Sequence, residues 1–393
     1  MKKVDVIIIG ASASGLMCAI EAGKRGRDVM VLDHANKAGK KILMSGGGRC
    51  NFTNYDVSSE NYISHNPHFV KSALSRFTQW DFIALVESYK IPYHEREHGQ
   101  LFCDISSKDI LKLLLSECKK AKSHIQLKTE IISIEKKSDH HYLIKTDKDD
   151  YHCQSLVIAT GGLSIPKMGA SPFGYKVAEQ FGIKVWPTTA GLVPFTLHKE
   201  DKETLSDLSG IAINSIVTSK QKSFRENILF THRGLSGPAI LQISSYWTAG
   251  ETVEINLLPD NDLLEELQSV SKEQPKIKLK TFLYKLLPKR LINVFIEAEL
   301  LDKTLQEISH KQILHVVASL QNWNIKPNGT EGYRTAEVTL GGVDCNALSS
   351  KTFECQSIPG LYFIGEVMDI TGWLGGYNFQ WAWSSGWCAG QHV

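Results

Sequence analysis

The sequence predicts an α/β protein whose main domain is built from two separate chain segments. A short apolar run rich in β-branched residues, Val4–Ile9, is followed by a glycine turn and an amphipathic segment. A glycine-rich texture of the same kind returns near residue 335, after a long stretch of different character. These observations indicate one domain interrupted by an insertion.

Length and composition describe an ordinary globular chain. Its 393 residues predict two or three domains. A net charge of +2 offers no electrostatic argument for a nucleic-acid or membrane partner. No apolar run approaches the roughly 20 residues that span a bilayer, and Asp5 and Gly10 leave the first run too short for an export signal. We expect a cytoplasmic protein with a small-molecule substrate, and nothing in the sequence indicates an oligomeric state.

The eight cysteines are scattered, and none forms a C-x-x-C pair. This spacing argues against structural zinc, an iron–sulfur cluster or a disulfide framework. We therefore expect no metal site.

The first elements form a βαβ unit. After the strand at Val4–Ile9, Leu16, Ala19 and Ile20 recur at helical spacing. Val29–Leu32 is a second strand that ends at Asp33. We expect a glycine-rich loop over residues 34–55 and a mixed helical region to about residue 125. A small antiparallel meander (131–153) then leads to a buried strand, Leu156–Ala159.

The insertion begins with residue patterns typical of β-strands and continues with patterns typical of α-helices. We expect residues 1–190 to form the first segment of the main domain, 191–261 a β insert, 262–325 a helical subdomain, 326–334 the return of the β insert, and 335–393 the second segment. A basic stretch, Lys272–Arg290, is interpreted as a solvated helix face because the net charge is balanced.

The turn GASASG, residues 10–15, resembles a dinucleotide-binding fingerprint without its middle glycine. Gly10 suits the tight turn and Gly15 the close helix packing, while Ser12 adds a hydroxyl that can donate to a phosphate. Asp33 stands 23 positions after Gly10, where a carboxylate accepts from a ribose 2′-OH and disfavours a 2′-phosphate. A strand–turn–helix without a ligand is the alternative, and the βαβ context with Asp33 favours the nucleotide.

Later glycine-rich segments separate FAD from NAD. They lie at residues 39–51, at Thr160–Gly162 after a buried strand, at Gly365–Glu366 after the last strand, and at Gly375–Asn378 before a helix. An acid at Glu366 can hold a ribityl hydroxyl, and a helix N-terminus can hold the pyrimidine edge of a flavin. An extended cofactor explains all four segments, so FAD fits and NAD alone does not. Because no second fingerprint occurs in mid-chain, any NAD(P)H binds transiently, or electrons come straight from the substrate.

Few residues suggest the reaction itself. Cys50 has no near cysteine neighbour before Cys103, which excludes a dithiol relay between sequence neighbours. Leu229–Pro238 is a polar, glycine-punctuated loop in which His232 is a candidate proton donor or acceptor and Arg233 a candidate anchor for the substrate. Tyr377 either faces the substrate or packs under the flavin.

With these residues in hand, the chain resembles the BaiN/YhiN-type bacterial flavoproteins, also called aminoacetone-oxidase-family FAD-binding enzymes. The resemblance rests on residues 40–54, 158–175, 228–244, 335–343 and 360–386. It implies a glutathione-reductase-like FAD domain in two segments, a β-barrel-like insert that carries helices, and non-covalent FAD. Such proteins are linked to amine oxidation and to reduction of steroid-like enones, and the resemblance carries over no catalytic residue.

The sequence therefore predicts an FAD-dependent oxidoreductase that transfers a hydride between flavin N5 and a small organic substrate. The alternatives are an amine-type oxidase that passes electrons to O₂, or a flavin-binding protein in RNA modification or regulation. The candidate cofactor-binding residues are Gly10, Ser12, Ala13, Ser14, Gly15, Asp33, His34, Lys40, Lys41, Ser45, Gly46, Gly47, Gly48, Arg49, Asn51, Ile132, Thr160, Gly161, Gly162, Gly365, Glu366, Gly375, Gly376, Tyr377, Asn378 and Phe379.

Overall fold

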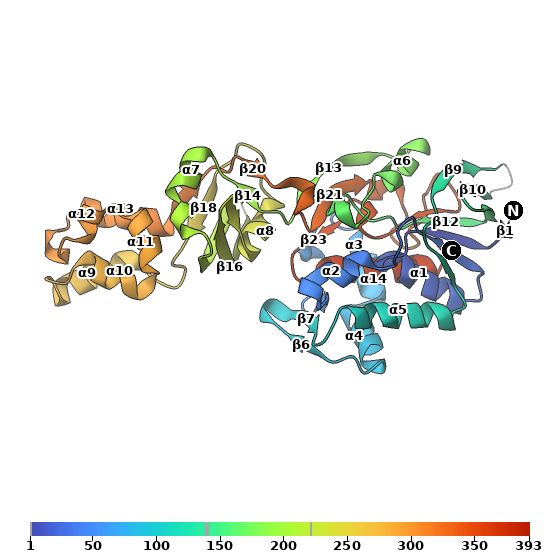
Figure 1. The fold of residues 1–393 in the computed structure, drawn as a ribbon, viewed down its shortest axis with the longest axis horizontal. Helices are drawn as coiled ribbons and strands as arrows, with labels where there is room; N and C mark the ends of the chain where they lie inside the picture. Colours follow the sequence, from blue (N-terminus) through green and yellow to red (C-terminus); the bar gives the residue numbers. More distant parts are fainter. Residues whose placement is uncertain (1, 138–140, 221) are drawn as a thin grey trace. The chain divides into compact units, whose positions relative to one another are not determined.

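The structure is a computed structural model that describes residues 2–137, 141–220 and 222–393. The chain forms two compact units, Met1–Ala190 with Glu337–Val393, and Gly191–Ala336. The N-terminal and C-terminal ends, blue and red in Figure 1, therefore belong to the same unit.

A five-stranded parallel sheet is the centre of the first unit. Its order is β22 (Leu361–Phe363), β12 (Ser155–Ile158), β2 (Val6–Ile9), β3 (Val29–Leu32) and β8 (His124–Gln126). Neighbouring strands pair in parallel, Ile9 opposite Leu32 and Ile158 opposite both Ile9 and Phe363. Every residue of β2 and β12 is buried, as their unbroken apolar runs predict. Because parallel strands share one carboxyl edge, the segments that follow them converge there.

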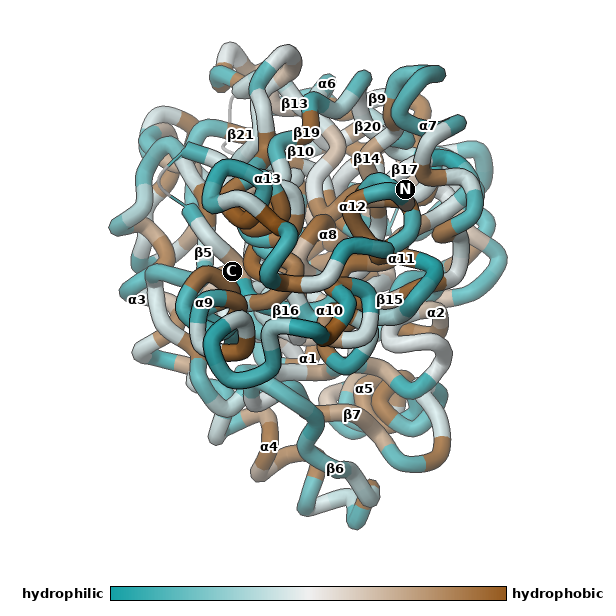
Figure 2. The backbone as a smooth tube through the Cα atoms, turned by 90° about the vertical axis from the view of Figure 1, so that its left-hand side faces the viewer, coloured by the Kyte–Doolittle hydropathy of each residue, from teal (hydrophilic) through white to brown (hydrophobic). Residues whose placement is uncertain are grey.

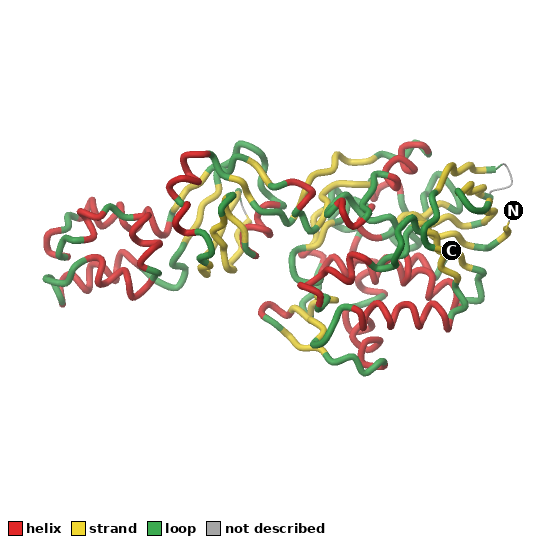
Figure 3. Tube along the Cα trace, in the orientation of Figure 1, coloured by secondary structure: helices red, strands yellow, loops and turns green. Residues whose placement is uncertain are grey.

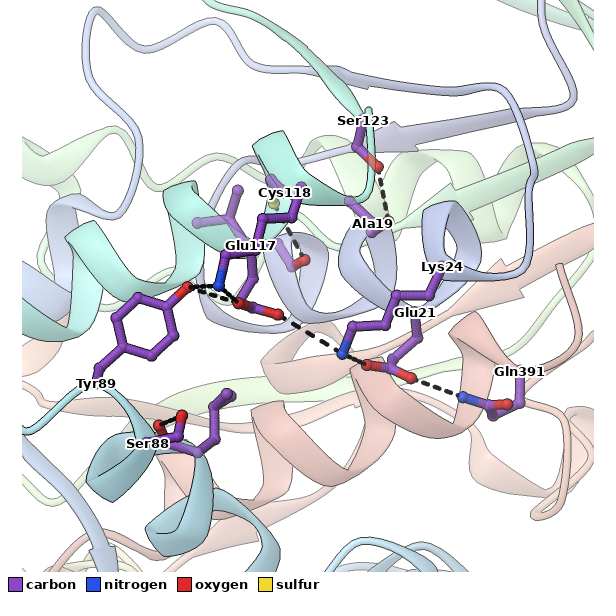
Figure 4. A network of polar contacts seen from close by, with 12 residues as sticks. Ala19, Glu21, Lys24, Ser88, Tyr89, Glu117, Cys118, Ser123 and Gln391 are labelled. Carbon is purple, nitrogen blue, oxygen red and sulfur yellow. Dashed lines mark hydrogen bonds and ion pairs between the residues drawn. The ribbon is translucent and has the colours of Figure 1, made fainter.

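Helices pack beside this sheet. They are α1 (Ala13–Lys24), α2 (Lys40–Gly48), α3 (Val70–Arg76), α4 (Gln79–Ser88), α5 (Lys108–Lys120), α6 (Phe173–Gln180) and α14 (Tyr377–Gly390). A polar network joins α1, α5 and the residue after α14 (Figure 4). Lys24 Nζ lies 2.8 Å from Glu21 Oε1 and 3.8 Å from Glu117 Oε2, and Gln391 Nε2 donates to Glu21 Oε2 at 2.9 Å. The network holds the end of α1 against two partners that are distant in sequence.

Smaller sheets complete the first unit. The expected meander is present as β9 (Ile131–Lys136), β10 (Tyr142–Thr146) and β11 (Asp150–Cys153), extended by β1 (Lys2–Lys3). The segment expected as a loop contains β4 (Asn51–Asn54), and the mixed helical region after it contains β6 (Tyr93–Glu95) and β7 (Gln100–Cys103). Two further pairs are β5 (Tyr62–Ile63) with β23 (Thr371–Gly372), and β13 (Val185–Gly191) with β21 (Val338–Val343).

The second unit is an antiparallel sheet with a helical subdomain (Figure 3). The strands run in the order β19 (Trp323–Ile325), β18 (Val253–Asn256), β15 (Ala212–Ser219), β16 (Lys222–Thr231), β17 (Gly234–Ser236), β14 (Phe195–Thr196) and β20 (Gly329–Thr330). Helices α7 (Lys199–Thr204) and α8 (Pro238–Ser244) accompany them. The subdomain consists of α9 (Leu263–Glu273), α10 (Leu279–Leu286), α11 (Lys289–Phe295), α12 (Ala298–Leu301) and α13 (His310–Gln321). Among the described residues, no helix is long and apolar enough to cross a membrane.

Candidate cofactor site

The turn between β2 and α1 needs both of its glycines. Gly10 has φ +118°, and a Cβ there would lie 2.2 Å from the carbonyl oxygen of Ala159 at the end of β12. A Cβ on Gly15 would lie 1.9 Å from the carbonyl oxygen of Gly10. Backbone atoms cannot move aside as a side chain can, so only glycine fits at either position. The buried residues Ala13 and Ser14 form the first turn of α1, whose amides face the phosphate position of a dinucleotide.

Ser12 is the N-cap residue of α1. Its backbone is extended (φ −120°, ψ −159°), and its side chain makes no capping hydrogen bond. The helix therefore does not use the hydroxyl, which stays available for the phosphate contact that the sequence predicts.

Asp33 is anchored by two backbone amides. Its Oδ2 accepts from Ala11 N–H at 2.7 Å, and its Oδ1 accepts from Ala35 N–H at 2.7 Å. Each carboxylate oxygen has a second lone pair, so the carboxylate can also accept from a ribose hydroxyl. His34 is exposed, and its ring lies beside Gly169, 3.1 Å from the position of a Cβ there.

The segment expected as a loop after Asp33 is partly helical, so that expectation was wrong. Lys40–Met44 form the helical part of α2 because lysine, leucine and methionine are good helix formers. Regular helix ends at Ser45 (ψ 147°), and Gly46 and Gly47 have positive φ. The true turn is thus Ser45–Arg49, in which Gly46, Gly47 and Arg49 are exposed.

A polar cluster joins α2 to three distant segments; we call Lys41, Ser164, Thr339 and Glu366 the Lys41–Glu366 cluster. Lys41 Nζ donates to Glu366 Oε2 and to Ser164 Oγ, both at 2.7 Å. Glu366 Oε1 accepts from Ser164 Oγ at 3.2 Å and from Thr339 N–H at 3.1 Å. Both charged side chains are largely buried, 28% and 19% exposed. The sequence reasoning named Lys41 and Glu366 and missed Ser164 and Thr339, although each lies next to a recognised motif.

The Thr160–Gly162 segment faces this cluster. A Cβ on Gly162 would lie 2.4 Å from Thr339 Oγ1 and 2.8 Å from Glu366 Oε1, while Gly161 has φ +71°. Thr160 Oγ1 is buried, and in the described chain it has no hydrogen-bond partner. The Cβ position of Gly174 lies 2.3 Å from this hydroxyl, so the Thr160 side chain packs against α6.

The turn that precedes α14 packs directly against β4. A Cβ on Gly376 (φ +94°) would lie 2.4 Å from the carbonyl oxygen of Thr53, so β4 approaches this turn directly. With its amide oriented to satisfy both ends, Asn51 Oδ1 accepts from Gly376 N–H at 3.1 Å and Nδ2 donates to Thr53 O at 3.1 Å. Gly375 has φ +121°, and Gly365 begins the short turn that carries Glu366.

The three residues after these glycines have packing roles. The Asn378 side chain accepts from Gly372 N–H and donates to Gly372 O, both at 2.8 Å, so it braces β23. Tyr377 is buried at 7% exposure, with its ring edge-on to those of Tyr62 and Trp373, and Phe379 stacks on Trp383. Tyr377 thus packs among aromatic rings of the first unit, and its role toward the flavin or the substrate stays a prediction.

Two candidates for chemistry lie in the second unit. Residues 229–238 are not one loop, as we expected, but the end of β16, a two-residue turn and β17. The alternating burial of Ile228 and Phe230 fits a strand, and Gly234 permits the tight pairing with Phe195. His232 is exposed on this turn, and Arg233 Nη1 lies 3.3 Å from Glu331 Oε2, so an anion would compete with Glu331 for Arg233.

Two cysteines that are far apart in sequence are neighbours in the fold. Cys50 and Cys103 flank the β4–β7 pairing, where Cys103 N–H lies 3.4 Å from Cys50 O. Both are fully buried, and burial raises the pKa of Cys50 and raises that of Cys103 to about 12. Both thiols therefore stay protonated, which does not support a redox relay.

Ile132, another candidate cofactor-binding residue, lies on β9, and its side chain is 69% exposed.

The residues present fit an FAD molecule. They offer a phosphate turn, a ribose acid, and glycine turns at Gly10, Gly15 and Gly376 where no Cβ fits. Fold and site together define an FAD-binding Rossmann-type oxidoreductase.

The chain belongs to the family described as HI0933-like protein Rossmann domain, whose model matches residues 4–392. This confirms the resemblance found in the sequence. A ribosomal RNA dihydrouridine synthase of Escherichia coli (strain K12) is 55% identical over 100% of this chain and 98% of its own length. A 3-dehydro-bile acid delta(4,6)-reductase of Clostridium scindens is 26% identical over 98% of this chain and 97% of its own length.

One solved structure supports the fold alone. It is a 3-ketosteroid-delta4-(5alpha)-dehydrogenase of Rhodococcus jostii RHA1, with a TM-score of 0.50 at 14% identity, covering 99% of this chain and 97% of that one. The chain is an FAD-dependent oxidoreductase, as predicted.

Proposed function

We propose that the protein reduces the C5=C6 double bond of a uridine in ribosomal RNA to give dihydrouridine. The observation that carries the proposal is the 55% identity, over essentially both full lengths, to a protein named as a ribosomal RNA dihydrouridine synthase. The substrate proposed here is therefore RNA, which the sequence offered only as an alternative to a small organic molecule. The reaction would take place in the cytoplasm, where ribosomal RNA is found.

The chemistry suits a flavoenzyme. The C5=C6 bond of uracil is conjugated with the C4 carbonyl, so a hydride added at C6 places negative charge on O4, and a proton then adds at C5. Bound FAD, once reduced by a nicotinamide nucleotide, supplies the hydride. One reduced nicotinamide and one proton therefore balance each dihydrouridine formed. The name of the bile-acid reductase also describes removal of carbon–carbon double bonds from a 3-oxo substrate, which is reduction of the same general class.

The chain's own residues would hold the cofactor. The N-terminus of α14 would offer the positive end of a helix dipole to the charge that develops on reduction. The Lys41–Glu366 cluster ties together segments that would hold the ribityl chain. Because a stacked base is out of reach, the uridine must leave its stack to enter the site.

A nucleoside assay tests this function. The FAD-loaded protein is incubated without oxygen with reduced nicotinamide and ribosomal RNA from a strain that lacks the gene, and the RNA is digested for mass spectrometry. We expect a uridine that is heavier by two hydrogen atoms and requires both FAD and nicotinamide. Absence of this nucleoside, with peroxide released from an amine in air, would instead establish the oxidase alternative.

A further inference from the structure

The helical subdomain carries a concentrated basic surface. Seven lysines or arginines and one acid, Glu273, lie within Lys272–Arg290, which we call the basic segment. It covers the end of α9, the α9–α10 connection, α10 and the start of α11. Figure 2 shows the α9–α10 connection largely in the colour of hydrophilic residues.

The basic side chains lie on the water-facing side of these helices. Leu279, Phe282 and Leu283 of α10 are buried, which settles the inner face of that helix. Lys272, Lys276, Lys285 and Lys289 are exposed. Packing therefore presents these four lysines to solvent.

Most of this positive charge is not neutralised within the protein. Lys278 and Lys280 share a single carboxylate, Asp302, at 3.2 and 2.6 Å. Over the described residues, none of the four exposed lysines forms an ion pair, and Lys289 Nζ lies 5.6 Å from the centre of the Tyr284 ring. The segment thus keeps a net positive charge in the folded state.

Apart from Glu273, the acids of the subdomain lie outside the basic segment in the sequence. Asp262, Glu265 and Glu266 stand at the start of α9, and Glu297 and Glu299 stand at α12. A surface kept only for solubility mixes both signs, whereas this segment carries seven basic residues and one acid. Separated positive charge is the usual footprint of a polyanion site.

We propose that the basic segment binds the phosphate backbone of ribosomal RNA; this rests on the proposed function. Lysine ammonium groups suit phosphates as point charges and release counterions on binding. Among the described residues of the segment there is no exposed large apolar side chain, which a membrane-surface helix would require. RNA is therefore favoured over an anionic lipid surface. The basic segment, which the sequence indicated as a solvated helix face, is thus proposed to bind RNA.

A charge-reversal pair with a matched control tests the surface. Lys285→Glu/Lys289→Glu is compared with Lys311→Glu/Lys326→Glu, which changes the same charge at two exposed lysines of the same unit. The affinity of each FAD-loaded protein for a ribosomal RNA fragment is measured by fluorescence anisotropy at several salt concentrations. We expect the first pair to bind about tenfold more weakly, with a slope against log salt reduced by about 1.4, and the control to stay close to wild type.

Several outcomes would overturn the proposal. Unchanged RNA binding, or equal weakening in both pairs, would show that the segment makes no specific contact. Loss of binding to phosphatidylglycerol vesicles alone would assign the surface to a membrane. Circular dichroism and flavin content verify that each variant is folded and loaded. A wild type that binds RNA but forms no dihydrouridine would refute the proposed function and leave the binding result to be judged separately.

Discussion

Two halves of the cofactor site are built in opposite ways. The dinucleotide turn and its acid, Gly10–Asp33, lie within one βαβ unit, and the turn is constrained by backbone atoms, of Gly10 within the turn and of Ala159 at the end of β12. In the Lys41–Glu366 cluster the two charged partners stand 325 positions apart and meet through side chains. The comparison teaches that the phosphate end of the site is set by backbone geometry, whereas the other end depends on packing of the whole unit. Substitutions in the two halves should therefore differ in how they lower the stability of the protein.

The largest loss of stability is expected for a substitution in the turn between β2 and α1. Gly15→Ala places a methyl group 1.9 Å from a backbone oxygen, so we expect the free energy of unfolding to fall by about 3 kcal/mol, together with loss of bound FAD. Urea titration and flavin absorbance measure both. The control is Gly26→Ala, which has positive φ (+82°) but no atom within 4 Å and should cost about 1 kcal/mol. Equal losses in the two variants would show that the clash is relieved and that the turn is not rigid.

A smaller loss of stability is expected in the Lys41–Glu366 cluster, and it should appear as an interaction energy between Lys41 and Glu366. Lys41→Met and Glu366→Gln each remove one partner of a largely buried pair, and each should destabilise the FAD-free protein by about 1–2 kcal/mol. A double-mutant cycle should yield a coupling of about 1 kcal/mol. The exposed pair Lys2–Asp149 is the control and should show only marginal coupling. Additive losses at Lys41 and Glu366 would mean that their contact contributes nothing to the fold.

The smallest effect concerns pH, at a contact that also joins distant segments of the first unit. Burial raises the pKa of Asp369, against the opposing hydrogen bonds from His65 N–H at 2.8 Å and its ring Nδ1 at 2.9 Å. In the window above the unfolded pKa of about 3.9, the native carboxyl binds more protons than the unfolded one. Its contribution to stability is therefore full below that pKa and is lost as pH rises through the native pKa.

Asp369→Asn removes this titration and keeps an acceptor for His65 N–H. Urea titrations between about pH 4 and pH 7 should show a flatter pH dependence in the variant than in wild type. An identical slope in the two proteins would contradict the shifted pKa.

Sequence reasoning succeeded where a pattern acts over short range. The apolar runs Val4–Ile9 and Leu156–Ala159 correspond to the buried strands β2 and β12, and the glycines of the turn and the acid after the second strand lie where their patterns predict. It failed where context decides. Lys40–Met44 became helix despite the neighbouring glycines, and Leu229–Thr231 became strand because their alternate side chains are buried in a sheet.

The sequence by itself determined the βαβ turn and the placement of the glycine segments at strand ends, because apolar strand runs and glycine turns are local patterns. Four such segments together indicated the cofactor. Only the tertiary structure decided that Lys41 pairs with Glu366 and Ser164, that Asn378 braces Gly372, and that Cys50 lies beside Cys103. Which charged or polar side chains meet depends on how strands and helices hundreds of positions apart are packed, and no local pattern carries that information.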